Sequence, residues 1–306
     1  MNLFHKKDQY QGYNIYSMKK YVDKKRIIFT TIIVILIIIT LGFIIYYSVD
    51  TTIRLKNAKR FEQKLIEYES KQEELKKQER ERQAKIPKLT DEGKQNIKGI
   101  YKSETKRVFL TFDDGPSVNT ADVLDILKSN DIKATFFVLG TQVEKMPEMV
   151  KRAYQEGHYI ANHGYSHQYS QIYSSPETVL QEFNQCNSAV AKAIDVPEYN
   201  SHLFRFPGGS VGGKYANLKA EAVTLLEQNN IMHVDWNALT GDAEKSSPDE
   251  EYLMNNLQKT TQNKNSIVIL MHDAQAKRVT VEFLPKLIEF FQQQGYQFEN
   301  FYSIIK

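Results

Sequence analysis

The chain has 306 residues, of which 41% are hydrophobic and 25% are charged, so it is long enough to bury a large core and is not a disordered tail. Its 40 basic and 37 acidic side chains nearly balance, so the charge gives no indication of a nucleic-acid partner and we expect none. The single cysteine, Cys186, excludes an intramolecular disulfide and a cysteine-held metal, so any bound metal must use histidines and carboxylates.

Residues 27–49 form an uncharged apolar run, IIFTTIIVILIIITLGFIIYYSV, about as long as the roughly 20 residues that cross a bilayer. The run is longer than the apolar part of a cleaved signal peptide, and no small-residue cleavage site follows it. A buried core helix of this length would normally carry some polar positions. We therefore expect a retained, single transmembrane helix in the cell membrane. The basic cluster at 19–26 favours a cytoplasmic tail over residues 1–26 and an extracellular remainder, although basic residues at 54–60 weaken this asymmetry.

Residues 50–86 are rich in Lys, Glu, Gln and Arg, contain no Gly or Pro, and predict a helical stalk. Phe61, Leu65, Tyr68 and Leu75 have heptad-like spacing, but this seam is too short to predict a dimer, so the oligomeric state stays open. Pro87 ends the stalk, and residues 87–104 are expected to form a polar linker.

From residue 105 to residue 306, short apolar runs alternate with amphipathic stretches. Strands are predicted at 107–112, 134–139, 158–163, 203–206, 231–236 and 266–272. Helices are predicted at 119–129, 145–156, 176–194, 214–229, 249–263 and 280–294. This alternation indicates an α/β domain with a parallel sheet covered by helices, either a barrel or a doubly wound sheet.

Ionisable side chains gather where the predicted strands end, at the edge where parallel sheets place their functional sites. They are Asp113, Asp114, His163, His167, Arg205, Asp235, Asp242, His272 and Asp273. A parallel arrangement would bring the five strand ends that carry them to one rim.

The sequence also holds an HxxxH pattern, formed by His163 and His167, whose spacing lets two imidazoles reach one metal. The pattern is weak by itself, because such pairs occur by chance. A carboxylate from another strand end, such as the pair Asp113 and Asp114, strengthens it. Two imidazoles and one carboxylate leave coordination positions open for water, as in hydrolytic zinc sites and in nonhaem iron sites.

Five segments together resemble the motifs of the polysaccharide deacetylases, the NodB-homology domain of carbohydrate esterase family 4. In chain order they are TFDDGP at 111–116, NHGYSH at 162–167, RFPGG at 205–209, DWNALTGDA at 235–243 and LMHD at 270–273. The resemblance covers roughly residues 105–304. It implies a distorted (β/α) barrel and a metal-dependent hydrolase that removes acetyl groups from N-acetylated sugars.

The resemblance implies that Asp114, His163 and His167 bind a divalent metal, for which we expect Zn²⁺, with Co²⁺, Ni²⁺ or Mn²⁺ as alternatives. Asp113 would then be the general base that takes a proton from the attacking water. His272 would protonate the departing amine.

Two further charges would support these catalytic groups. Arg205 would pair with Asp113 and keep it ionised, unless it is only a fold-stabilising ion pair. Asp242 would orient His272 and favour its protonated form, with Asp235 as the competitor for that role.

The expected substrate pocket consists of Tyr169, Pro207, Trp236 and Leu270. Leu270 would receive the acetyl methyl and Trp236 would cover it, although both could be ordinary core residues. A backbone N–H near Tyr169 or Ser170 would help to stabilise the oxyanion.

Two positions depart from the commonest form of the motifs. Gly164 stands where Ser or Thr is usual, so a hydrogen bond that steadies the metal-binding loop is expected to be missing. Ala243 follows Asp242 where many members have Trp, which removes an aromatic wall unless Trp236 supplies it. These two departures leave the metal site and the reaction as expected, but they make the preferred substrate uncertain.

The anchor, the stalk and the domain together predict an enzyme that deacetylates N-acetylglucosamine in cell-wall peptidoglycan. Chitin-like oligomers, poly-N-acetylglucosamine and N-acetylmuramic acid are alternative substrates for the same chemistry. A nonhaem iron oxygenase and a catalytically weak glycan-binding module are alternatives of other classes. The neighbouring Asp113, Arg205 and His272 suit hydrolysis better than oxygen chemistry.

Overall fold

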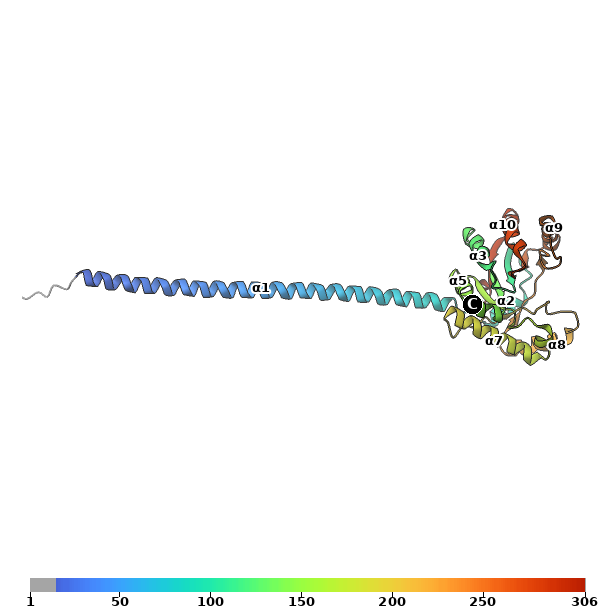
Figure 1. The fold of residues 1–306 in the computed structure, drawn as a ribbon, viewed down its shortest axis with the longest axis horizontal. Coiled ribbons are helices and arrows are strands. Elements are labelled where there is room, and N and C mark those ends of the chain that lie inside the picture. Colours follow the sequence, from blue (N-terminus) through green and yellow to red (C-terminus); the bar gives the residue numbers. More distant parts are fainter. Residues whose placement is uncertain (1–14, 306) are drawn as a thin grey trace, which may run out of the picture. The chain divides into compact units, whose positions relative to one another are not determined.

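The computed structural model describes residues 15–305 and divides into two compact units that separate between Glu79 and Arg80. Helix α1 (Ile15–Ala84) is one continuous helix (Figure 1); its residues 15–79 belong to the first unit and its residues 80–84 to the second. The side chains of residues 22–49 are all exposed, as are Phe61, Leu65, Tyr68 and Leu75. Within the described part of the chain, α1 is the one helix long and apolar enough to cross a membrane.

The expected division into tail, membrane helix and stalk stays a prediction. Helix α1 continues without a break through residues 15–84, so no change of backbone marks the boundaries at 26 or 49, and the helix ends two residues before the expected boundary at 86. The first half of the expected cytoplasmic tail, residues 1–14, lies outside the described residues.

The second unit is built on an eight-stranded parallel sheet in the order β5-β4-β3-β2-β1-β7-β6, with β8 also paired to β1. The strands are β1 (Arg107–Asp113), β2 (Thr135–Val138), β3 (Tyr159–Asn162), β4 (Leu203–Phe204), β5 (Met232–His233), β6 (Ala238–Leu239), β7 (Ser266–His272) and β8 (Gln297–Glu299). Strand β7 pairs with β1 along its whole length, while β8 and β2 share the other edge of β1. This half-barrel of parallel strands confirms the predicted distorted (β/α) barrel.

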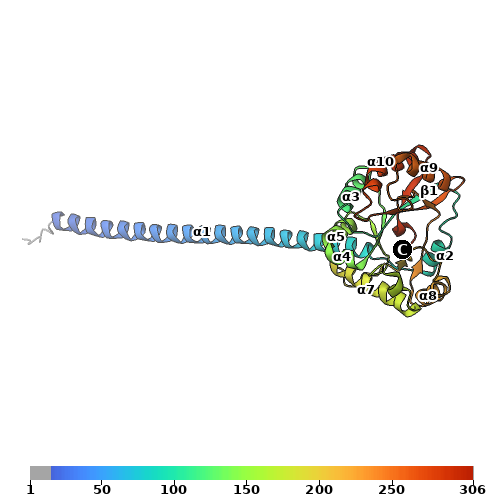
Figure 2. The same ribbon diagram turned by 45° about the vertical axis from the view of Figure 1, so that its right-hand side comes forward.

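Helices surround the strands, as Figure 2 shows. They are α2 (Asp91–Lys98), α3 (Thr120–Ser129), α4 (Gly140–Lys145), α5 (Pro147–Gln155), α6 (Tyr169–Ile172), α7 (Pro176–Ile194), α8 (Ala216–Gln228), α9 (Glu250–Thr261) and α10 (Arg278–Gln293), with a 3₁₀ turn at Phe301–Ser303. Side chains alternate between the two faces of a strand, so each central strand contributes residues to two hydrophobic cores, one on each face of the sheet.

The alternation along β1 explains where the site lies. Val108, Leu110 and Phe112 belong to the outer core that packs beneath the helices. Phe109 belongs to the inner core at the amino end of the sheet, with Phe301 and Val268. The positions on the same face that follow Phe109 are Thr111 and Asp113, so this face changes from apolar to polar toward the carboxyl end of β1.

Several element boundaries differ from those expected. The helix predicted at 145–156 is α5, which begins at Pro147 because proline suits the first turn of a helix. Helix α4, which ends at Lys145, was not predicted. The expected linker at 87–104 contains helix α2, which is capped by Thr90 and buries Ile97, followed by buried Ile100. Strands β6 and β8 were not predicted.

Candidate active site

The candidate site lies at the carboxyl ends of the strands, on their inward-facing positions. Asp113 ends β1 and His272 ends β7, and the two are paired in the sheet register. A cavity of about 270 Å³ opens there and is lined by Asp113, Asp114, His163, His167, Tyr169, Gly208, Trp236, Leu239, Gly241, Asp242, Ala243, Glu244, Leu270 and His272. A larger depression of about 930 Å³ beside α9 has no histidine or carboxylate among its lining residues, so it offers no comparable chemistry.

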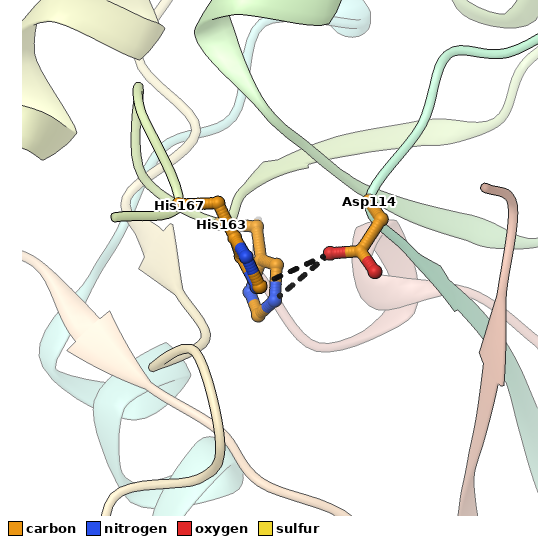
Figure 3. A group of neighbouring side chains, drawn as sticks. All are labelled: Asp114, His163 and His167. Atoms are coloured by element: carbon orange, nitrogen blue, oxygen red, sulfur yellow. Dashed lines mark ion pairs between the residues drawn. The ribbon is translucent and has the colours of Figure 1, made fainter. Parts of the chain in front are cut away.

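Three of the predicted residues form a compact set of potential metal ligands. Asp114 follows β1, and His163 and His167 lie on the loop after β3. The Oδ1 atom of Asp114 is 3.6 Å from Nε2 of His163 and 3.4 Å from Nε2 of His167. Figure 3 shows both rings directed toward this one oxygen. Within residues 15–305, this is the one group of three His, Cys, Asp or Glu side chains with metal-like clustering.

The geometry of this set fits a bound cation. Ligands at the usual 2.0–2.2 Å from a tetrahedral zinc lie about 3.3 Å from one another. The Oδ1 atom of Asp114 is buried and accepts no hydrogen bond from the described residues, which is costly for a carboxylate oxygen. Burial lowers the pKa of His163 to about 3, so its ring is neutral and presents a lone pair. A divalent cation between the three atoms would satisfy all of them.

A backbone carbonyl fixes the orientation of the His163 ring. The Nδ1 atom lies 2.8 Å from the carbonyl oxygen of Arg205. Because a carbonyl can only accept, Nδ1 carries the hydrogen, and Nε2 is left as the ligand atom. This is the arrangement in which metal-binding histidines are usually held.

Asp113 is held by the fully buried Arg205, as the sequence predicted for this pair. The Nη1 group of Arg205 donates to Oδ1 of Asp113 at 2.8 Å and to the Thr111 hydroxyl at 2.7 Å. Its Nε and Nη2 groups donate to the carbonyl oxygens of Val234 and Asp235. The guanidinium also stacks on Phe137, with 3.9 Å from Cζ to the ring centroid. Every nitrogen of Arg205 therefore has a partner, which compensates for its burial.

The electrostatics of Asp113 differ from the expectation. Burial raises the pKa of its carboxyl above the ordinary value, although the charges of Arg205 and His272 act in the opposite direction. Arg205 thus offsets the cost of burying Asp113 without lowering its pKa below normal. A carboxyl with a raised pKa is a stronger base than an ordinary aspartate.

His272 is held by Asp242, and Asp235 lies elsewhere. The Nδ1 atom of His272 is 3.0 Å from Oδ1 of Asp242, and its backbone N–H donates to Oδ2 at 2.8 Å. The Thr280 hydroxyl donates to the same Oδ2 at 2.7 Å. Asp235 instead accepts from the backbone N–H and the hydroxyl of Ser210. The structure therefore brings Asp242, and not Asp235, against His272.

The surroundings of His272 favour its charged form. Burial alone would lower the pKa of His272, but the hydrogen bond and charge of Asp242 raise it above the ordinary value. Asp113 and Asp114 act in the same direction. Because Asp242 engages Nδ1, Nε2 is the ring nitrogen that remains without a partner on this carboxylate, and the residue lines the cavity.

Three of the four predicted pocket residues line the cavity. Tyr169, at the start of α6, lies edge-on to His167, with 5.6 Å between ring centroids, and Trp236 and Leu270 complete the set. Pro207 is not among the lining residues. It is buried, its carbonyl oxygen accepts from the Tyr173 hydroxyl, and the next residue, Gly208, lines the cavity instead.

Two buried carboxylates behind the site were not assigned a role from the sequence. Asp273 accepts from the hydroxyls of Ser117 and Thr120 and so pins the loop that follows Asp114. Glu182, on α7, bonds to the loop that carries the two histidines. The signal for Glu182 was available, because an acidic residue there interrupts the apolar stripe of α7.

Comparisons with known proteins agree with this geometry. The sequence pattern of the family described as polysaccharide deacetylase matches residues 101–225. YheN of Bacillus subtilis is 36% identical over 198 residues, which cover 63% of this chain and 66% of YheN. A peptidoglycan-N-acetylglucosamine deacetylase of Bacillus cereus is 33% identical over 205 residues, which cover 65% of this chain and 71% of that protein.

The fold has a solved counterpart as well. The structure of a Streptococcus mutans CE4 esterase superposes with a TM-score of 0.62 at 30% sequence identity, covering 67% of this chain and 90% of that one. The family match falls on the unit that carries the cavity, where the half-barrel and the five motif segments lie. The chain therefore belongs to the polysaccharide deacetylase family, carbohydrate esterase family 4, and is a hydrolase of the deacetylase type.

Proposed function

We propose that the chain removes acetyl groups from N-acetylglucosamine residues of peptidoglycan by metal-dependent hydrolysis, giving a free amine and acetate. One observation carries the proposal: a ligand-like triad, a buried aspartate and a histidine held by a second buried aspartate converge on one cavity of about 270 Å³. The reaction needs an electrophilic centre, a base and an acid in this arrangement.

Asp114, His163 and His167 would hold the cation, because their ligand atoms have suitable spacing and Asp114 Oδ1 accepts no hydrogen bond within the described residues. A divalent cation there would polarise the amide carbonyl and lower the pKa of water. Zn²⁺ is the proposed ion, with Co²⁺, Ni²⁺ or Mn²⁺ as alternatives that the same donor set accepts.

Asp113 is the proposed general base. Its Oδ1 is engaged by Arg205 at 2.8 Å, whereas Oδ2 lies 3.8 Å from Nε2 of His163 and faces the triad. Oδ2 would take a proton from the attacking water as the new carbon–oxygen bond forms. Arg205 would keep Asp113 in place while the proton moves.

His272 is the proposed general acid. Asp242 holds Nδ1, which leaves Nε2 to donate its proton to the amide nitrogen as the carbon–nitrogen bond breaks. The proton that Asp113 removes and the proton that His272 supplies balance the hydrolysis. The products are an amine and acetic acid.

The substrate assignment rests on relatives and on the cavity. The Bacillus cereus relative is named a peptidoglycan-N-acetylglucosamine deacetylase. Leu270 and Trp236 give the cavity apolar walls beside the catalytic groups, which suits an acetyl methyl and a sugar face. Ala243 lines the cavity with Glu244 beside it, so this wall has no aromatic side chain at the position after Asp242.

We also propose that residues 27–49 anchor the enzyme in the cell membrane, with residues 1–26 in the cytoplasm and the catalytic unit outside. Support comes from the uncharged run and the exposed side chains of α1 in this segment. An anchored domain would act on a polymer that lies close to the membrane.

The substrate can be tested with full-length protein in detergent, loaded with Zn²⁺ and incubated with purified peptidoglycan, chitooligosaccharides or poly-N-acetylglucosamine. Mass spectrometry of the digested wall is expected to show glucosamine in place of N-acetylglucosamine and unchanged N-acetylmuramic acid. If acetate were released only from one of the other glycans, that glycan would replace peptidoglycan as the proposed substrate. Glycan binding without acetate release from any polymer would favour a binding module.

A further inference from the structure

The loop that carries both histidines, residues 163–167, is held from behind by the buried carboxylate of Glu182. This side chain is 2% exposed. Its Oε2 atom accepts the backbone N–H groups of Tyr165 at 2.6 Å and Ser166 at 2.7 Å, and its Oε1 atom accepts the Ser166 hydroxyl at 2.7 Å. Three short hydrogen bonds to this carboxylate tie the loop to α7.

The carbonyl groups of the same loop are held on the other side by helix α4. The N–H groups of Gly140 and Thr141 donate to the carbonyl oxygens of Gly164 and Tyr165, both at 3.0 Å. The loop is therefore fixed through its carbonyl groups by α4 and through its N–H groups by Glu182. The position of the histidine that ends it depends on both.

The loop needs such support because its backbone is strained. His167 has a φ of 58°, in the left-handed region that is uncommon for residues other than glycine, whereas Gly164 adopts its φ of 91° without strain. Strained conformations persist where surrounding contacts over-determine them. A Cβ atom on Gly164 would lie 3.0 Å from Cδ1 of Ile172 and 3.4 Å from Oε2 of Glu182, so the carboxylate occupies the space beside this glycine.

We propose that Glu182 is a positioning residue for the metal site, and that it supplies the loop support expected to be missing because residue 164 is glycine. It does not touch the cation or the substrate. It fixes the backbone of Tyr165 and Ser166, and thereby the direction in which His167 presents Nε2 to Asp114. The inference rests on the proposed function through the identity of the metal ligands.

The test is the affinity of the full-length protein for Co²⁺, measured by competition with a chelator, together with the visible absorption spectrum of the bound ion. Glu182→Ala is expected to weaken Co²⁺ binding about 10–100-fold and to change the spectrum, as changes behind metal ligands do. Glu182→Gln can keep the bonds to both N–H groups through its carbonyl, so its loss should stay below about tenfold.

Asn187→Ala is the matched control on the same helix. Asn187 also ties α7 to a loop, donating to the carbonyl of Tyr199 at 2.8 Å and accepting from the N–H of Ser201 at 3.0 Å, but that loop carries no ligand. We expect a comparable fall in melting temperature with unchanged Co²⁺ affinity. If Glu182→Ala does not fold, Glu182→Asp, which retracts the carboxylate, should still weaken binding.

Wild-type Co²⁺ affinity in Glu182→Ala, or in Glu182→Asp where the alanine variant is unfolded, would overturn the inference. Equal losses of affinity in Glu182→Ala and Asn187→Ala would also overturn it, because the role would then be stability alone. Since these measurements use no substrate, they are separate from the proposed reaction. If the wild type bound Co²⁺ tightly but released no acetate, the proposed function would be contradicted, whereas the positioning role of Glu182 would not be affected.

Discussion

The carboxylates on the two sides of the cavity differ in the hydrogen bonds that they accept. On the side of β1 and β3, Oδ1 of Asp114 is buried and accepts no hydrogen bond within residues 15–305. On the side of β6 and β7, Asp242 accepts three hydrogen bonds, from the N–H and ring of His272 and from Thr280. A carboxylate whose oxygens accept hydrogen bonds fixes the groups that donate to it. A buried carboxylate oxygen without a donor can instead bind a cation. The comparison supports the proposed cation site on one side and the proposed proton donor, His272, on the other.

Removing the unsatisfied carboxylate should have the largest effect. Asp114→Ala takes away one of three ligands, so we expect the protein to lose high-affinity Zn²⁺ binding and acetate release to fall to background. Equilibrium dialysis and an acetate assay measure the two effects. A variant that still binds one Zn²⁺ tightly would remove Asp114 from the ligand set.

Replacing the neighbouring carboxylate should separate the two functions. Asp113→Asn leaves the triad in place but removes the base, so acetate release should fall by about 10²–10⁴-fold while Zn²⁺ affinity stays near that of the wild type. The same dialysis and acetate assays apply. Parallel losses of binding and activity would show that Asp113 is a ligand and that the two sides are not distinct.

The pair of His272 and Asp242 should determine how kcat/KM depends on pH. The pKa of His272 is raised above its ordinary value, and activity needs the protonated ring, so activity should fall as the pH rises through that pKa. Asp242→Asn removes the raising charge and should move this alkaline limb of kcat/KM to lower pH. Asp235→Asn is the control, because Asp235 bonds to Ser210, and it should leave the limb in place. A shift in the control alone would reverse the assignment.

The apolar wall should have the smallest effect. Leu270 is 9% exposed and lines the cavity, so Leu270→Ala enlarges the space expected for the acetyl methyl. We expect kcat/KM for N-acetyl substrates to fall by about tenfold, with a smaller loss for N-propionyl substrates that fill the added space. Side-by-side assays of both substrates measure the ratio. An unchanged ratio would mean that Leu270 only packs the core.

The sequence predicted the parts of the fold that depend on strong apolar patterns. Strands β1 and β7 were predicted within one residue and helix α7 at the observed bounds, because long buried strands and long amphipathic helices have clear periodicity. Strand β6 has two residues and β8 has three, which is too short for any period to appear. Helix α2 was missed because its few buried residues lie among polar ones.

The site was predictable where it depends on strand ends, and less so where it depends on loop geometry. Asp114, His163 and His167 were expected to meet, since parallel strands place their carboxyl ends at one edge. Pro207 was expected in the cavity, but the direction of the turn at Gly208 and Gly209, both with positive φ, cannot be obtained from spacing. The contact between Glu182 and the histidine loop joins distant segments, and only the folded structure shows it.

The most direct test of the central claim is a titration. Full-length protein is freed of metal with a chelator, and acetate release from peptidoglycan is then measured as Zn²⁺ is added. We expect release to rise in proportion to Zn²⁺ and to level off at one ion per chain, with no such rise in Asp114→Ala. Release that is independent of added Zn²⁺, or no release from a chain that has bound one ion, would contradict a metal-dependent peptidoglycan deacetylase.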